Sequence, residues 1–329
     1  MDAHVLMLFA NLRSFIEDNQ LMFANALLRL GCRVTAGALH SVSQRNGRIW
    51  CQAVKVDQAL KVGDGYDNTE LSSIPADTFD FIWVMSVPHP AMATDIYQML
   101  WILNKKVKFI NTTDAMLFLN NKSALSAYVP SGNLIEAYTS NEYTDLASIY
   151  RDNKHVRWIV KPTNEGCGRD VFLLEPGSMN NKALLQSQTG NALPEESIKE
   201  RPLTGVANRY CVLQRYITNV RGNEKRIVLA GGKLITFYHR LHMDDDHRGN
   251  LFHGAGIELC ELTSDESNLV SNIGHRLLDL GVRYTALDIA FPYVIEINMV
   301  NPGGIPELFR VTGVDLSDTA VASVMGSFK

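Results

Sequence analysis

The hydrophobic and polar positions of this chain form two successive patterns. Up to about residue 118, short apolar runs typical of buried parallel strands alternate with segments of helical periodicity. The first such run is VLMLFA at 5–10, and the helical segment at 16–30 follows it. Strand-like runs at CRVTAGAL, RIWCQAV, FDFIWVMS and VKFIN are interleaved with a helical DIYQMLWILNKK. This alternation predicts an open α/β layer.

Beyond residue 118 the pattern changes to hairpins and helices. Strand-like runs occur at WIVKP, DVFLLE, YCVLQRYI and EKRIVLAGGKLITFYHRL, the last with a Gly231-Gly232 pair typical of a tight turn. We therefore expect this half to be α+β. The polar interval from about 176 to 207 contains Gly and Pro, which predicts a helix flanked by mobile connections.

Composition narrows the class of protein. A chain of 329 residues with 46% hydrophobic residues can bury a large core, and we expect two or three subdomains. The 31 basic and 35 acidic residues nearly cancel, so no net field attracts nucleic acid or an anionic membrane. The five cysteines lack paired spacing, which predicts free thiols in a reducing cytoplasm. The N-terminal apolar run is too short for an anchor and lacks the basic start of a signal peptide.

Two acids and an amide in the segment YTALDIAFPYVIEIN point to a site. Asp288 and Glu296 are equidistant from Pro292, where we expect a hairpin to turn, so the two carboxylates should face each other. Strand alternation places Asn298 on the same face as Glu296. Paired carboxylates are costly to bury without a cation, and all-oxygen ligands favour Mg²⁺ with phosphate. A solvated edge hairpin is an equally good interpretation of these residues alone.

Several stretches in order resemble the bacterial glutathione synthetases, which are ATP-grasp ligases. They are NNKSALSAY, WIVKPTNEGCGRDVF, VLQRYITNVRGNEKRIVLAGGKLITFYHRL, HRGNLFHGAG, LTSDESNLVSNIGHRLLDLGVRYTALDIA and VIEINMVNPGGIPEL. The resemblance runs from near the N-terminus to about residue 309. It implies a fold of mixed α/β and α+β class, in which an N-terminal open α/β (pre-ATP-grasp) domain precedes the ATP-grasp fold. The expected division is 1–118 for that domain, 119–207 for a subdomain with the phosphate lysines, and 208–329 for a subdomain with the Mg²⁺ site.

The resemblance also implies an activity. ATP would lie between the two ATP-grasp subdomains, and Mg²⁺, which Mn²⁺ could replace, would assist ligation of a carboxylate to an amine through an acyl phosphate. No protein nucleophile is needed, so the protein acts by positioning and charge neutralisation. We expect small-molecule carboxylate and amine substrates, neither nucleic acid nor membrane as a partner, and a homo-oligomer.

The residues that match the motifs supply the predicted site. Lys161 ends an apolar strand and Lys122 begins a short helix, where lysines suit phosphate as point charges, although surface lysines would fit too. The predicted catalytic residues are Arg226, Lys161 and Arg248. The predicted ATP contacts are Lys122, Lys161, Gly166, Gly168, Gln214, Arg215, Tyr216, Ile217 and Glu224, of which Glu224 would take the ribose. The predicted substrate contacts are Arg248, Asn250, Asn301, Gly303 and Gly304, with backbone donors in the Pro302-Gly303-Gly304 turn. The predicted metal ligands are Asp288, Glu296 and Asn298.

The substrate side departs from the family pattern. Bacterial glutathione synthetases usually carry an arginine-lysine-acid-proline-proline motif where this chain has SVPHP at 86–90. Their Thr-Ser-Pro after the metal asparagine is Val300-Asn301-Pro302 here, and Pro306 stands where an arginine is expected. We expect ligation of a pair other than γ-glutamylcysteine and glycine, or a divergent glutathione synthetase that recruits Arg13 or His89. A dipeptide or natural-product amide ligase, a kinase-like transfer and a non-ligating ATP-binding regulatory protein are the alternatives.

Overall fold

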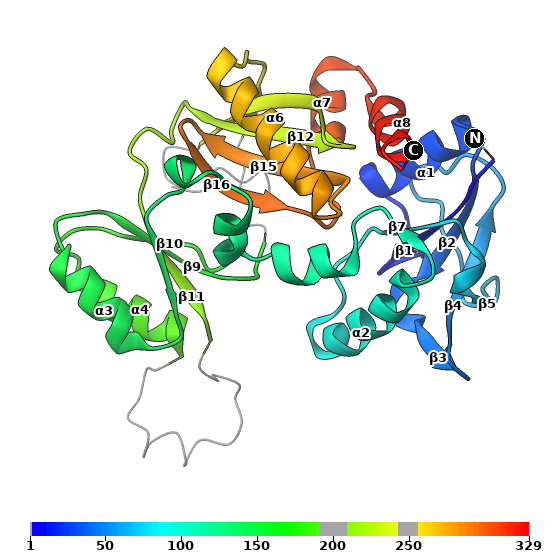
Figure 1. Cartoon of the computed structure of the whole chain (residues 1–329), viewed down its shortest axis with the longest axis horizontal. Coiled ribbons are helices and arrows are strands. Elements are labelled where there is room, and N and C mark those ends of the chain that lie inside the picture. Colours follow the sequence, from blue (N-terminus) through cyan, green and yellow to red (C-terminus); the bar gives the residue numbers. More distant parts are fainter. Residues whose placement is uncertain (1, 167, 191–208, 243–255, 329) are drawn as a thin grey trace.

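The structure is a computed structural model that describes residues 2–166, 168–190, 209–242 and 256–328. Its described residues form three β-sheets with helices packed against them (Figure 1). The sheets follow one another along the chain, and the predicted change from an α/β layer to α+β structure is confirmed.

The first sheet is the predicted open α/β layer. Its strand order is β3-β4-β2-β1-β6-β7, with β5 paired to β4; β1 is parallel to β2 and β6, and β6 to β7. The strands are β1 His4–Phe9, β2 Arg33–Ala38, β3 Ser43–Arg45, β4 Arg48–Val56, β5 Ser72–Pro75, β6 Phe81–Val84 and β7 Lys108–Phe109. Central strand β1 is apolar because one face packs in a core with α1 (Asn19–Arg29) and the other in a core with α2 (Ala93–Asn104).

Helix α1 begins three residues later than the apolar periodicity predicts. The Asp18 side chain accepts hydrogen bonds from the backbone N–H groups of Gln20 (2.8 Å) and Leu21 (3.3 Å). This cap satisfies donors of the first helical turn, so the helix begins after Asp18. Residues 16–18 are therefore outside the helix, although their pattern looks helical.

The second sheet has the strand order β10-β9-β11-β8, and its pairings are antiparallel. Its strands are β8 Ala137–Ser140, β9 Trp158–Pro162, β10 Phe172–Leu174 and β11 Cys211–Arg215. Helices α3 (Tyr143–Asp152) and α4 (Asn181–Thr189) pack on it through a core that includes Leu146, Trp158 and Leu185. The helix predicted between 176 and 207 is therefore α4, and residues 191–208 lie outside the described ranges.

The third sheet has the order β14-β13-β12-β15-β16, with antiparallel pairs. Its elements are β12 Glu224–Ala230, β13 Lys233–Leu241, β14 Gly256–Glu258, α6 Ser264–Asp279, β15 Tyr284–Ala290, β16 Tyr293–Asn298, α7 Ile305–Thr312 and α8 Ser317–Gly326. The predicted Gly231-Gly232 turn joins β12 to β13, and both glycines have positive φ. A Cβ at Gly231 would lie 2.3 Å from the Ser323 carbonyl oxygen, so glycine is required there.

The third sheet and the first sheet share one core. Helix α8 packs against α1, and the core beneath them combines Val5 and Phe23 with Val228, Tyr284 and Val324. Figure 1 accordingly shows the C-terminal helix beside the N-terminal elements. Strand β11 pairs with the second sheet, so the chain passes from the second to the third sheet after Arg215, not at the expected boundary of 207/208. Among the described helices, none has the length and apolarity needed to cross a membrane.

Candidate active site

A row of polar side chains crosses the middle of the third sheet. Arg226 on β12 lies opposite Tyr238 on β13 and opposite Asp288 on β15, and Asp288 lies opposite Glu296 on β16. The predicted facing of the two acids is confirmed, but by a different route. The hairpin pairs Ala290 with Tyr293, and an irregularity between Asp288 and Ile289 then shifts the register by one residue. This shift is what brings Asp288 opposite Glu296.

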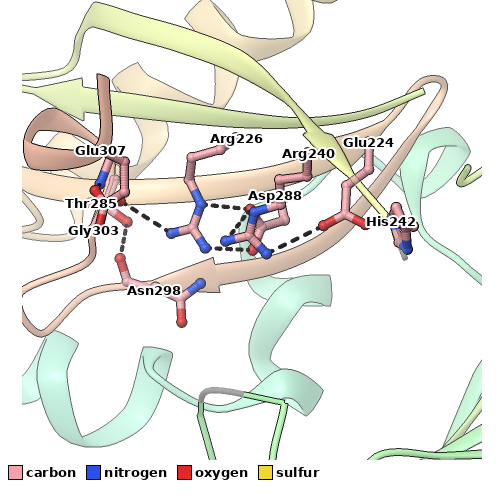
Figure 2. Close-up of polar contacts among 10 residues, drawn as sticks. Glu224, Arg226, Arg240, His242, Thr285, Asp288, Asn298, Gly303 and Glu307 are labelled. Carbon is pink, nitrogen blue, oxygen red and sulfur yellow. Dashed lines mark hydrogen bonds and ion pairs between the residues drawn. The ribbon is translucent and has the colours of Figure 1, made fainter. Parts of the chain in front are cut away.

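Asp288 is the centre of a buried ion-pair cluster (Figure 2). Its Oδ1 lies 2.8 Å from Arg226 Nε and 3.4 Å from Arg240 Nη2, and its Oδ2 accepts a 3.1 Å hydrogen bond from Arg226 Nη2. Burial raises the pKa of the Asp288 carboxyl, and Glu224 and Glu296 add to the rise while Arg226 opposes it. The buried guanidinium of Arg226 thus has the acidic partner that its apolar strand requires.

The cluster leaves buried polar atoms without hydrogen bonds. Asp288 Oδ1 and the Nε atoms of Arg226 and Arg240 have no hydrogen-bond partner of good geometry, despite the short ion-pair distances. Such atoms are costly unless further groups complete them. A divalent cation would be coordinated by the Asp288 oxygen, and phosphate oxygens would accept hydrogen bonds from the guanidinium groups. The residues present therefore fit Mg²⁺ with a polyphosphate.

The three predicted oxygen ligands lie on two neighbouring strands of the third sheet. Asp288 and Glu296 supply carboxylates, and Asn298 lies two residues beyond Glu296 on the same strand, opposite Ala286. Its backbone carbonyl accepts a hydrogen bond from Thr285 Oγ1 (2.8 Å), which fixes this end of β16. Within the described ranges no three His, Cys, Asp or Glu side chains converge as metal ligands, so a site here depends on the amide.

The two predicted phosphate lysines lie beside these acids. Lys161 is buried in β9, and burial lowers the pKa of its ammonium group to about 8 although Glu296 opposes this effect. Lys122 begins the short 3₁₀ segment Lys122–Ala127; its Nζ lies 3.4 Å from Glu296 Oε1 and also donates to the Glu165 carbonyl. Lys122 therefore connects the predicted metal acid with the loop 164–170.

A cleft between the second and third sheets contains most of the predicted ATP contacts. Lys161, Gly168, Glu224, Asp288 and Glu296 line it, and so does the connecting segment 214–217. The Arg215 N–H donates to the Glu136 carbonyl and the Tyr216 N–H to the Arg157 carbonyl, each at 2.9 Å. Seven of the nine predicted ATP contacts thus line this one cavity, whereas Lys122 and Gly166 are not among its lining residues.

Two residues of the cleft were missed by the sequence reasoning. Arg240 and His242 follow Tyr238 at alternate positions, and both contact Glu224: Arg240 Nη1 lies 3.4 Å from Oε1, and His242 Nε2 lies 2.8 Å from Oε2. The signal was present, because Thr236, Tyr238 and Arg240 occupy the buried face of β13. A charged residue in that alternation requires a buried partner.

Some of the predicted substrate-binding residues make other contacts in the structure than the sequence led us to expect. The Gly304 N–H is not a free donor, because it donates to Glu307 Oε2 (2.5 Å) as part of the cap of α7. Gly303 instead offers its carbonyl to Arg226 Nη1 at 3.4 Å. Asn301 has φ of 48° and a buried Oδ1 without a hydrogen-bond partner. Arg248 and Asn250 lie outside the described residues.

The segment that departs from the family motif is hydrogen-bonded to neighbouring elements. Ser86 Oγ accepts hydrogen bonds from the Ala10 N–H (3.0 Å) and from Gln20 Nε2 (3.2 Å). His89 Nδ1 accepts from the Ala91 N–H at 3.2 Å, and the His89 N–H donates to His40 Nε2 at 3.0 Å. Ser86 therefore joins the chain after β6 to the end of β1 and to α1, and His89 caps the short helical turn Pro90–Met92.

The fold and the cleft define the class of protein. A solved RimK domain protein of the ATP-grasp type from Sphaerobacter thermophilus has the same architecture, with a TM-score of 0.62 at 14% identity over 98% of this chain and 100% of that chain. A family model described as the prokaryotic glutathione synthetase ATP-grasp domain matches residues 133–313, more than half of the chain. The chain has the ATP-grasp fold and belongs to this glutathione synthetase family.

Individual relatives agree with this placement. The glutathione synthetase of Gloeobacter violaceus is 30% identical over 167 residues, 51% of this chain, and the match spans just under half of that protein, 47%. The glutathione synthetase of Coxiella burnetii is 27% identical over 281 residues, which are 84% of this chain and 82% of that protein. The resemblance therefore extends beyond the ATP-grasp portion into the N-terminal layer.

Proposed function

We propose that this protein is an ATP-dependent carboxylate–amine ligase that forms an amide through an acyl phosphate. The observation that carries the proposal is that Lys161, Asp288 and Glu296 line one cleft between two sheets, while Lys122 is ion-paired with Glu296 and Arg226 with Asp288. Cations beside paired acids are what a metal-bound triphosphate requires, since both its charge and the charge of its cation must be neutralised.

In this proposal the residues of the cleft divide the work by position. The backbone of 214–217 binds the base, Glu224 takes the ribose, and Lys122 and Lys161 hold the phosphates. Asp288, Glu296 and Asn298 would hold Mg²⁺, or Mn²⁺ in its place, which when bound neutralises phosphate charge and acts as a Lewis acid.

Arg226 is placed to stabilise charge that moves during the reaction. A substrate carboxylate would attack the γ-phosphate of ATP, and the amine would then displace phosphate from the acyl phosphate to give the amide. Arg226 spans from Asp288 to the Gly303 carbonyl, and its guanidinium is buried. An anionic oxygen that approaches this guanidinium would gain a charge-assisted hydrogen bond in a water-poor site.

We infer that the substrates are a small-molecule acid and amine other than γ-glutamylcysteine and glycine. Ser86, Val87 and Pro88 stand where the family motif has its three charged residues, and the Ser86 hydroxyl accepts hydrogen bonds from the Ala10 N–H and from Gln20 Nε2. Each lost charged hydrogen bond to a zwitterionic peptide would cost about 1.5–3 kcal/mol. A dipeptide or natural-product amide ligase is the form of this proposal that the departures favour.

A substrate screen tests the function. Purified protein with ATP and Mg²⁺ is incubated with pairs of carboxylates and amines, and ADP release is measured with the masses of the products. A ligase gives ADP and a product of acid plus amine minus water. ADP with only a phosphorylated acid would indicate a kinase, and neither product across the screen would indicate a binding protein.

The pair γ-glutamylcysteine and glycine is the reference within that screen. A kcat/KM of about 10⁴ M⁻¹s⁻¹ or more with this pair would contradict the inference of changed specificity and identify a glutathione synthetase. We also infer a homo-oligomer in the cytoplasm, which light scattering after size exclusion and cell fractionation would check.

A further inference from the structure

His242 has one ring nitrogen engaged and one that lacks a partner. The residue directly follows β13, its side chain is 3% exposed, and it lines the cleft. Nε2 lies 2.8 Å from Glu224 Oε2, whereas Nδ1 is buried and makes no hydrogen bond. A buried polar atom without a partner is uncommon and calls for a missing group.

The Glu224 carboxylate is held from two sides. Arg240 Nη1 contacts Oε1 at 3.4 Å and His242 Nε2 contacts Oε2 at 2.8 Å, so each oxygen has one donor and an accepting position left over (Figure 2). The Arg240 guanidinium also contacts Asp288 and therefore joins Glu224 to the centre of the ion-pair cluster. Glu224 and His242 form a rigid pair at the wall of the cleft.

The chemistry of the imidazole ring indicates what the missing group must be. A carboxylate only accepts hydrogen bonds, so Nε2 donates to Glu224, and when this is the single proton of the ring, Nδ1 is an acceptor. In this tautomer the partner of Nδ1 is a donor. Phosphate oxygens only accept, whereas a sugar hydroxyl can donate. The pairing with Glu224 thus favours a hydroxyl over a phosphate.

The position of the pair agrees with a sugar. The segment 214–217, Lys161 and the Glu224–His242 pair line the same cleft. In the proposed nucleotide site the ribose lies between the base, which 214–217 reads, and the phosphates, which Lys161 holds.

We propose that His242 is a specificity-determining residue of the nucleotide site, whose Nδ1 accepts a hydrogen bond from a ribose hydroxyl of ATP while its Nε2 positions Glu224 for the same sugar. This inference rests on the proposed function, because it requires ATP in this cleft. It adds a contact that recognises ribose rather than deoxyribose.

Two substitutions separate the two nitrogens. The amide of His242→Gln can replace Nε2 at Glu224 but leaves nothing at the position of Nδ1. The amide of His242→Asn can replace Nδ1 but is too short to reach Glu224. His275 is an exposed histidine of α6 whose Nδ1 contacts the Ser271 carbonyl, so His275→Gln is the matched control.

The test is calorimetric binding of ATP, 2′-deoxy-ATP and 3′-deoxy-ATP with Mg²⁺, after melting curves show that each variant is folded. Wild type should bind at least one deoxy analogue about fivefold to tenfold more weakly than ATP, the size of one net hydrogen bond. His242→Gln should lose that much ATP affinity and stop discriminating against the one analogue that lacks the hydroxyl bound by Nδ1, while the discrimination that Glu224 supplies through the other hydroxyl remains. His242→Asn should keep part of the discrimination, and His275→Gln should equal wild type.

Two results would overturn the proposal while ATP binding itself remains intact. His242→Gln could discriminate as wild type does, or it could weaken all three nucleotides equally, which is what a purely structural role would give. Absence of ATP binding by wild type would instead refute the proposed function, and this inference with it.

Discussion

Replacement of either proposed metal ligand, Asp288 or Glu296, should abolish ATP binding, but only one of the two replacements should destabilise the metal-free fold. Asp288 is 5% exposed in its side chain and contacts two guanidinium groups, Arg226 at 2.8 Å and Arg240 at 3.4 Å. Glu296 is 25% exposed in its side chain and pairs with Lys122 at 3.4 Å. The two acids therefore differ in what their charge does when no metal is bound.

This difference sets the expected loss of folding stability for each variant. Removal of one partner from a buried ion pair costs about 3–5 kcal/mol, and Asp288→Asn should lie at the low end, near 3 kcal/mol, because the amide keeps one acceptor oxygen and because burial, which raises the pKa of Asp288, already disfavours its carboxylate. At about 2–4 °C per kcal/mol, the melting temperature should fall by roughly 6–12 °C. Glu296→Gln breaks a partly exposed pair worth about 1 kcal/mol or less, so its melting temperature should change by about 4 °C at most.

The assay is thermal melting in excess chelator, followed by calorimetry of ATP with Mg²⁺ on the same samples. Asp279→Asn, an exposed aspartate at the end of α6, is the control and should lie within about 0.5 kcal/mol of wild type. Equal melting of Asp288→Asn and wild type would refute the buried ion-pair cluster. Full turnover of either acid variant, or of wild type in excess chelator, would refute the metal assignment.

Three further predictions concern charges. Lys161→Ala should weaken ATP binding. Arg226→Ala should mainly lower turnover, because Arg240 still lies 3.4 Å from Asp288 and keeps that carboxylate paired. Unchanged ATP affinity of Lys161→Ala would contradict this division. The pKa of Lys161 is lowered to about 8, and its protonated form binds phosphate, so ATP affinity of wild type should fall as pH rises through 8. Calorimetry from pH 7 to 9 should show that fall in wild type but not in Lys161→Ala, and a flat wild-type profile would count against a phosphate contact. Glu266→Gln should lower the free energy of unfolding by about 3–5 kcal/mol, since Lys225 Nζ lies 2.7 Å from both buried Glu266 oxygens; a denaturant titration with an unchanged midpoint would contradict it, and ATP affinity of the folded variant should be unchanged.

The fold was predictable where local pattern and burial agree. Strand β1 is recognisable in the sequence because it is buried on both faces and is therefore a continuous apolar run. Helix α2 is recognisable because its apolar residues form a stripe along one side. The short edge strands β3 and β5 were not predicted, since polar residues occupy most of their positions. The start of α1 depends on the Asp18 cap, which periodicity alone does not locate.

The site was predictable in its residue types more than in its contacts. Asp288 and Glu296 face each other only because the register of the hairpin shifts between Asp288 and Ile289, and no sequence signal for that shift was recognised. The pairing of Asp288 with Arg226 and Arg240 joins strands that are distant in sequence. Such partners are fixed by sheet order, which alternation along one strand cannot reveal. For the same reason Gly304 looked like a free donor until Glu307 was seen to cap it.

The measurement that tests the central claim most directly is transfer of oxygen-18 from the acid substrate to phosphate. The best acid from the screen is labelled in both carboxyl oxygens and incubated with ATP, Mg²⁺ and its amine, and the released phosphate is analysed by mass. An acyl phosphate intermediate predicts one labelled oxygen in each phosphate and a stoichiometric amide product. Amide formation with unlabelled phosphate would contradict the proposed mechanism.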